Sequence, residues 1–210
     1  MKGGFMMCCY SNKTVAFLML FIILTFFVGC YKIYEHHMPT AVDMSFQQRQ
    51  KIPLRAGLYM SEDFLHYSYE WEVEFGKHVF PIGAILQNGS KDMIKAAFQD
   101  MIIVLSPEEA NTKRVDVVIS PSVETVILPY ELKMRAYQDA GIFIKWMISD
   151  IEGNPIWVET IEGNSHLEKE RLYQTREELM DKSLQLAIEN QFQKSFQKIV
   201  SSNWWASIKE

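Results

Sequence analysis

The clearest alternation of hydrophobic and polar residues runs from Tyr67 to Phe75. Aromatic or aliphatic side chains occupy every second position, and one serine and three glutamates stand between them. This period of two is that of a β-strand, whose successive side chains point to opposite faces. The segment therefore predicts a half-buried strand with an apolar and an acidic face. An acidic strip that binds a basic partner or a cation is the alternative, although carboxylates about 7 Å apart need other ligands to hold one cation.

Two longer segments repeat their hydrophobic residues every three or four positions, as amphipathic helices do. The first covers residues 82–101, although Gly89 and Ser90 weaken its middle and could break it. The second begins after Thr175, which pairs with Glu178 in a capping box, and extends to about residue 202. Its stripe is typical of a helix that packs on a sheet, and packing on a partner helix is the alternative. The stripe consists of Met180, Leu184, Ile188, Phe192, Phe196, Ile199 and Val200.

Shorter apolar runs predict further strands at residues 53–60, 102–105, 115–119 and 123–137. Pro121 is expected to end the third of these runs, because proline interrupts a central strand. Residues 142–149 and 155–162 predict a hairpin around a glycine-containing loop, and Ser61 is a candidate N-cap for one short helical turn. Together, the elements predict an α+β fold in which one mostly antiparallel sheet packs against two long helices.

An apolar stretch near the N-terminus indicates where the protein resides. Lys13 precedes fourteen residues, Val15–Val28, in which only Thr25 is polar, and Gly29 and Cys30 follow. A basic start, a short apolar segment and a small residue form the order of a secretory signal. The cysteine after the small residue resembles a bacterial lipoprotein signal, although a phenylalanine stands where leucine is usual. The resemblance implies that residues 1–29 are a signal peptide and that Cys30 is the lipidated mature N-terminus.

An uncleaved signal-anchor with a free or palmitoylated Cys30 is the alternative. At 1.5 Å per residue, fourteen helical residues cover about 21 Å, whereas the hydrocarbon core of a bilayer is about 30 Å thick. If the leader is a lipoprotein signal, residues 30–52 are the lipidated cysteine and a flexible tether, because the segment is polar and lacks periodicity. His36 and His37 are expected to be solvated there. Residues 53–205 are predicted to form a single α+β domain.

Charge and cysteine content exclude several classes of partner and cofactor. The leader contains Lys2 and Lys13 and no acidic residue, so its removal changes the net charge from −5 to −7. Nucleic acids and anionic lipid surfaces need clustered Lys and Arg, so no nucleic-acid partner is expected. The only cysteines are Cys8, Cys9 and Cys30, which excludes a disulfide framework and a cysteine-based metal site in the domain. No metal and no cofactor is predicted.

No catalytic motif is recognisable in the chain. It lacks a Gly-x-Ser-x-Gly elbow, a His-Glu-x-x-His pair, a phosphate-binding glycine loop and a dinucleotide fingerprint. We therefore expect a protein that is not an enzyme; a hydrolase would require His and acidic side chains to converge in a cleft. Trp204 and Trp205 are predicted to hold the C-terminal helix on the sheet, and exposure to a partner or membrane interface is the alternative.

The order of elements behind the signal resembles a group of small envelope lipoproteins. The group includes the auxiliary lipoproteins of ABC-type lipid transporters, the lipopolysaccharide-assembly lipoprotein and the YajG-like lipoproteins. The likeness lies in the helix from Gly83, in residues 115–121, and in the hairpin 145–157 with the capped helix after it. It implies a non-catalytic binding or assembly factor that faces the periplasm and serves an envelope protein partner. Tyr31 after the cysteine favours the outer membrane over the inner membrane.

A lipid carrier is the second functional hypothesis. In that case a cavity between sheet and helices, lined by Phe98, Phe192 and Phe196, would hold a lipid ligand. An open cavity of about 300 Å³ or more would favour this hypothesis, and a packed interior would favour the binding factor.

Overall fold

The computed structural model describes residues 31–41, 44–47, 50–73, 76–129, 137–168 and 175–208. Its strands form a five-stranded sheet of order β5-β2-β6-β7-β8 and a three-stranded sheet of order β1-β4-β3. The larger sheet consists of β5 (Phe98–Val104), β2 (Ile52–Tyr59), β6 (Val117–Ile127), β7 (Tyr137–Ser149) and β8 (Pro155–Glu168). The smaller sheet consists of β1 (Lys32–Glu35), β4 (Gly76–Pro81) and β3 (Ser68–Val73).

The α+β class is confirmed, but the prediction of one mostly antiparallel sheet is wrong. Strand β2 runs parallel to both β5 and β6, and β1 runs parallel to β4; only β3–β4 and β6–β7–β8 are antiparallel. Parallel neighbours need a crossover, and the one between β2 and β5 contains a short helix, two strands of the small sheet (β3 and β4) and a long helix. Hydrophobic periodicity reports which face of a strand is buried and does not report its partner.

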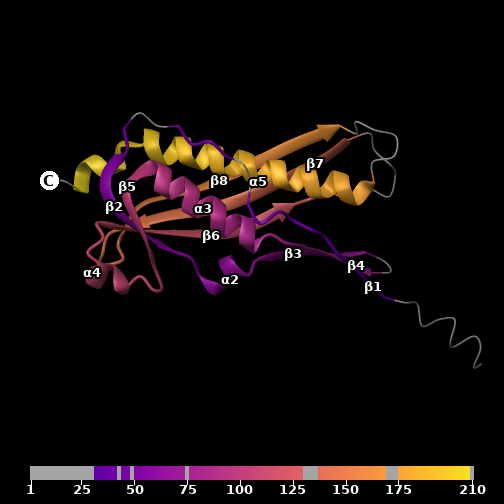
Figure 1. Ribbon diagram of the computed structural model, residues 1–210, viewed down its shortest axis with the longest axis horizontal. Coiled ribbons are helices and arrows are strands. Elements are labelled where there is room, and N and C mark those ends of the chain that lie inside the picture. Colours follow the sequence, from indigo (N-terminus) through magenta and orange to yellow (C-terminus); the bar gives the residue numbers. More distant parts are fainter. Residues whose placement is uncertain are drawn as a thin grey trace, which may run out of the picture.

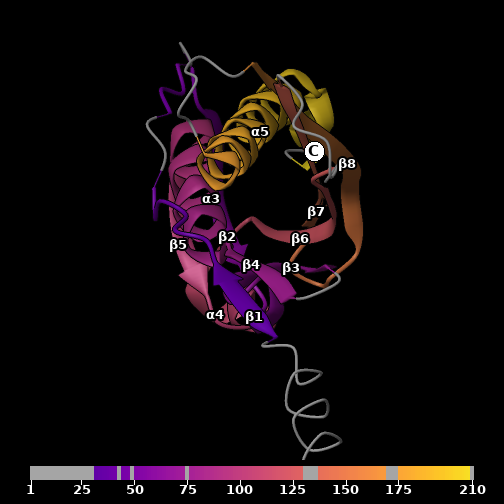
Figure 2. The ribbon, with the colours of Figure 1, turned by 90° about the vertical axis from the view of Figure 1, so that its right-hand side faces the viewer.

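Two long helices, α3 (Gly83–Ala97) and α5 (Arg176–Ser201), pack on one side of the larger sheet. Figure 2 shows the sheet curving around this pair. Two short helices, α2 (Glu62–Leu65) and α4 (Glu109–Lys113), bring to four the α-helices in the part of the chain that the structure describes, and the 3-10 helix η1 (Asn203–Ile208) follows α5. The end of the molecule that carries β1 lies opposite the end that carries α4 (Figure 1).

The predicted caps are confirmed. The Ser61 hydroxyl accepts a hydrogen bond from the Phe64 N–H at the start of α2. At the start of α5, Thr175 and Glu178 exchange both bonds of the capping box, at 3.1 Å each. These bonds satisfy N–H groups that have no partner within the helix.

The first long helix ends earlier than its spacing predicts. The backbone becomes extended at Phe98 (φ −109°, ψ 156°), and residues 98–104 pair with β2 as strand β5. Gly89 does not break the helix; it lies where the ring of Phe192 approaches α3. Pro121 does not end β6, which continues to Ile127. Because β2 pairs with β6 only at residues 117–119, the missing N–H of Pro121 costs no bond to β2.

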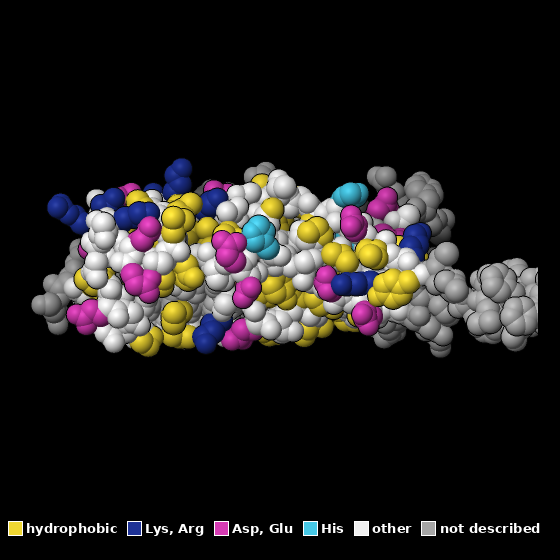
Figure 3. Space-filling view, turned by 90° about the horizontal axis from the view of Figure 1, so that it is seen from below, with side chains coloured by type: hydrophobic (Ala, Val, Ile, Leu, Met, Phe, Trp, Pro, Cys, Tyr) yellow, Lys and Arg dark blue, Asp and Glu magenta, His cyan; other side chains and the backbone are white. Residues whose placement is uncertain are grey.

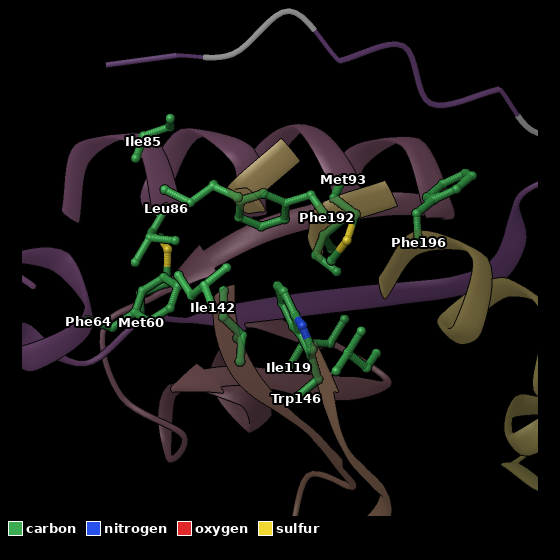
Figure 4. Packing of buried hydrophobic residues seen from close by; sticks show 14 of the residues in the cluster. Met60, Phe64, Ile85, Leu86, Met93, Ile119, Ile142, Trp146, Phe192 and Phe196 are labelled. Carbon is green, nitrogen blue, oxygen red and sulfur yellow. The ribbon is translucent and has the colours of Figure 1, made fainter. Parts of the chain in front are cut away.

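One buried cluster joins the two long helices and both sheets. It contains the predicted stripe of α5, with Met180, Leu184, Ile188 and Ile199 fully buried, and it also contains Phe80 of the small sheet. Figure 4 shows Phe192 and Trp146 among the buried side chains between the helices and the sheet. Their rings meet edge to face, with centroids 6.2 Å apart. The hairpin β7–β8 turns at Gly153 (φ +89°), and Asp150 accepts the N–H groups of Glu152 and Asn154.

Candidate functional site

The small sheet builds a ladder of rings directly after the predicted lipidation site. Tyr34 of β1 is in register with His78 of β4, and His78 is in register with Trp71 of β3. The Tyr34 and His78 rings stack with centroids 4.8 Å apart, and Trp71 lies on the other side of His78 at 5.5 Å. The alternation predicted for β3 places Trp71 on this face and leaves Glu70 and Glu72 exposed on the other. The predicted half-buried strand is therefore confirmed.

His36 connects this ladder to the C-terminal helix. Its ring stacks on Phe80 with centroids 3.7 Å apart, and its backbone N–H donates to the Val79 carbonyl. One ring nitrogen, Nδ1, lies 2.6 Å from an Asp181 carboxylate oxygen of α5, and the other, Nε2, lies 2.8 Å from Nδ1 of His78. With both rings neutral, His36 donates to Asp181 and accepts from His78, so each contact has one proton. These hydrogen bonds join three segments that are far apart in the sequence: the residue after β1, strand β4 and helix α5.

The interpretation of residues 30–52 as a lipidated cysteine and a flexible tether needs correction in its described part. Residues 32–35 form β1, and Met38, Met44 and Phe46 pack against the core. His36 is 4% exposed, so the expectation that it is solvated is wrong; His37 is exposed as expected. The element that the sequence did not reveal is β1. It is only four residues long, and it is a strand because β4 supplies its backbone partners.

Burial and neighbouring charge hold the pKa of His78 below its ordinary value of about 6.5. Loss of hydration is the largest cause, and the charge that His36 can carry is the next, because both disfavour the protonated ring. Arg176 acts in the same direction. Glu177 and Asp181 act against it.

We expect the free energy of unfolding to fall when the pH drops below about 6.5. A lowered pKa in the folded state means that the unfolded chain binds the proton more readily. The stability due to neutral His78 is therefore complete above about 6.5 and is lost as the pH falls from there toward the lowered value. Urea denaturation at a series of pH values gives the free energy of unfolding as a function of pH. Below about 6.5, this free energy should change less steeply with pH for His78→Gln than for the wild type. His37→Gln is the control, and a slope unchanged in His78→Gln would contradict the assignment.

The predicted lipidation site, Cys30, lies outside the described residues. Phe192 and Phe196 lie in the core, with exposed fractions of 0% and 6%. Phe98, also proposed as a cavity residue, is 0% exposed. The three side chains come together with other core residues and fill space between the helices and the sheet.

Trp204 and Trp205 are half-buried and pack against the same core. The Trp204 indole N–H donates to the Ile199 carbonyl at 3.1 Å, and its ring lies 6.1 Å from that of Phe98. These contacts are those expected of residues that hold the end of α5 against β5. Contact with a partner through either indole stays a prediction.

Two surface grooves open on the side of β8. One, of about 400 Å³, lies between β8 and α5 and is lined by Glu159, Glu162, Lys194 and Lys198, among others. The other, of about 470 Å³, contains Asp139 and His166, whose contact is 2.7 Å. None of the three core phenylalanines lines either groove.

Within the described ranges, no group of three or more His, Cys, Asp or Glu side chains is placed to hold a metal ion. Among the same residues, no helix has the length and hydrophobicity to cross a bilayer.

Comparison with known proteins gives similarity at the level of solved structures. No protein-family model matches the chain, and no curated protein sequence matches it. A Xanthomonas campestris protein of the DUF330 family model is 8% identical, with a TM-score of 0.43 over 80% of this chain and 92% of its own. A minor lipoprotein from Acinetobacter baumannii is 12% identical, with a TM-score of 0.43 over 72% of this chain and 94% of its own. A Neisseria meningitidis lipoprotein is 10% identical, with a TM-score of 0.37 over 71% of this chain and 100% of its own. With TM-scores under 0.5, the function of this chain has to be argued from its own residues.

Proposed function

We propose that this chain is a non-catalytic lipoprotein of the cell envelope, anchored through a lipid on Cys30 and facing the periplasm. The observation that carries the proposal is the order basic residue, fourteen mostly apolar residues, glycine and cysteine in residues 13–30. The folded part supports it, because its first strand begins two residues after Cys30. Tyr31 after the cysteine supports the outer membrane as the place of residence.

A role in binding and not in catalysis is supported by the geometry of the groove that contains Asp139 and His166. Asp139 and His166 are both substantially exposed, and the hydroxyl nearest in sequence, Ser165, is next to His166 on β8. Neighbouring residues of a strand point to opposite faces. The Ser165 hydroxyl donates to the Ser183 carbonyl at 2.7 Å, so it is held on α5 and away from the imidazole.

A packed interior supports a binding or assembly factor over a lipid carrier. The cavity of the second hypothesis would have to open between Phe98, Phe192 and Phe196, and these side chains are in contact with the core instead. Helix α3 and helix α5 approach so closely at Gly89 that a Cβ there would lie 2.5 Å from the Phe192 ring. The packing therefore favours a function through contacts of the outer surface with a partner over a function through a ligand held in the interior.

We propose that side chains make the contacts with an envelope partner. Addition of a partner strand to the sheet is disfavoured where side chains of this chain already bond to the backbone of the edge strands. On β5, Lys113 donates to the Ile103 carbonyl, and directly after the strand Glu109 accepts the Leu105 N–H. On β8, Lys194 donates to the Glu162 carbonyl. Charged side chains that occupy edge groups in this way block pairing with another strand.

The lipid anchor is tested by Cys30→Ser. We expect the wild type to fractionate with membranes and its mature N-terminus to be an acylated Cys30 by mass spectrometry. The variant should lose the acyl group and retain the leader, because the modified cysteine is the cleavage position. Identical modification and identical membrane association in wild type and variant would overturn the lipoprotein. Affinity purification of the acylated form, with co-purified proteins and lipids identified, then separates a protein partner from a carried lipid.

A further inference from the structure

We infer that one end of the three-stranded sheet rests directly on the phospholipid surface that holds the lipid of Cys30. The inference rests on the proposed function, since it requires Cys30 to carry the anchor. The end concerned consists of Tyr31, Lys32, Ile33 and Val73, and is called here the membrane-facing end. It lies away from α4 and the β7–β8 loop (Figure 1).

The first argument is reach. A flexible tether of about twenty residues has a root-mean-square length of about 25 Å, which would hold the domain off the bilayer. Consecutive Cα atoms are about 3.8 Å apart, so Cys30 lies within about 8 Å of the Cα of Lys32. Lys32 is already paired with Gly76 in the sheet. The fold therefore cannot leave the surface in which the lipid is inserted.

The second argument is the attachment of β1 to the rest of the domain. All four residues of β1 are in register with β4, from Lys32–Gly76 to Glu35–Val79. Immediately after the strand, His36 is held by Asp181 of α5 and by His78. A strand that pairs with β4 along its whole length, and whose following residue is held by α5, transmits the position of the anchor to the whole domain.

The third argument is the chemistry of the exposed side chains. Tyr31 and Ile33 are each 58% exposed, and they are two of the large hydrophobic side chains that the surface leaves in solvent. Lys32 is exposed, and its ammonium group lies 4.6 Å from the centroid of the Tyr34 ring. Tyrosine and lysine are the residues that place an apolar body and a polar tip at a membrane interface.

The fourth argument is the order of charge away from this end. In register, Lys32, Gly76 and Val73 form the terminal row, and Ile33, Lys77 and Glu72 form the next one. Among the described residues of the sheet, Glu35 and Glu70 come two rows later, beside Val79. Figure 3 shows hydrophobic, basic and acidic side chains mixed toward the right-hand end of the molecule, the end at which β1 lies in Figure 1. This order favours contact by the end of the sheet, because its acidic outer face would be repelled by anionic lipids.

The experiment uses the acylated protein in vesicles of phosphatidylethanolamine and phosphatidylglycerol. After removal of the leader the mature chain has no cysteine besides Cys30, so one introduced cysteine is the only free thiol. A nitroxide label is placed at Ile33→Cys and, as the matched control, at Leu105→Cys. Leu105 is an exposed hydrophobic residue beside α4, at the opposite end. Collisions of the label with membrane-soluble oxygen and with a water-soluble nickel chelate are then compared.

We expect the label at position 33 to lose collisions with the nickel chelate and to gain collisions with oxygen, whereas the label at position 105 behaves as in water. A Gly/Ser insertion of about twenty residues between Cys30 and Tyr31 should restore the chelate collisions at position 33. Equal behaviour of the two labels, without the insertion, overturns the inference. Mass spectrometry of the same sample separates the two proposals. An unmodified Cys30 overturns the lipoprotein, whereas an acylated Cys30 with a water-exposed label at position 33 overturns only the contact with the bilayer.

Discussion

Gly163→Ala is expected to destabilise the fold by about 3 kcal/mol or more, because it forces β8 and α5 apart. A Cβ at this position would lie 2.2 Å from the carbonyl oxygen of Ala187 and 2.2 Å from the Cβ of Gln191. The first contact is with helix backbone, which cannot rotate away as the end of a side chain can. Gly163 is buried, so the new methyl group has no solvent into which to turn. The free energy of unfolding of the purified chain in urea measures the effect.

Gly141→Ala is the matched control, because Gly141 is a buried glycine of the neighbouring strand β7. The nearest atom to a Cβ there is that of Ile127, at 3.7 Å, which is an ordinary van der Waals distance. We expect Gly141→Ala to change the free energy of unfolding by no more than about 1 kcal/mol. Equal losses for the two variants would mean that the close approach of β8 and α5 at Gly163 is not what the alanine disturbs.

Phe192→Ala is expected to cost about 3–5 kcal/mol, the range for removal of a fully buried phenylalanine. The ring fills the space between Trp146 of the sheet and Gly89 of α3. The same geometry predicts that Gly89→Ala changes stability in opposite directions with and without the Phe192 ring. In the wild type, Gly89→Ala places a methyl group 2.5 Å from the ring and destabilises the fold. Without the ring, alanine at position 89 fills part of the cavity and stabilises the helix by up to about 1 kcal/mol relative to glycine.

The double variant Gly89→Ala, Phe192→Ala should therefore be more stable than Phe192→Ala alone. Urea denaturation of the wild type, the two single variants and the double variant completes a double-mutant cycle. Gln197→Ala, at an exposed position of the same helix, is the control and should change stability by about 0.5 kcal/mol at most. A double variant less stable than Phe192→Ala would show that the two positions do not share one space.

The packing measured by these variants bears on function, because it decides between a filled interior and a ligand cavity. If Phe192→Ala is as costly as expected, its ring contributes to a core and not to the wall of an open pocket. The proposed function then depends on contacts of the outer surface and on the anchoring of the domain next to β1. His36 and β1 connect that place to α5 through the Asp181 contact.

Local patterns were sufficient for elements whose partners lie close in the sequence. The capping box at Thr175 and the stripe of α5 predict a helix because a helix makes its backbone bonds within itself. The β7–β8 hairpin is predicted from its loop, and the structure extends both of its strands beyond the predicted ends. The alternation around Trp71 predicts the buried face of β3 correctly, although not the sheet to which β3 belongs.

By itself, the sequence determined the α+β class, the caps, the buried faces and the order of residues that proposes a lipid on Cys30. Only the tertiary structure decided that residues 98–101 leave the helix for β5, that β2 lies between two parallel neighbours, and that Lys32–Glu35 and His36 belong to the domain. The physical reason is that a strand obtains its hydrogen bonds from another part of the chain. The four residues of β1 contain no pattern that specifies β4 as their partner. The residues around His36 contain none that specifies an aspartate 145 residues away.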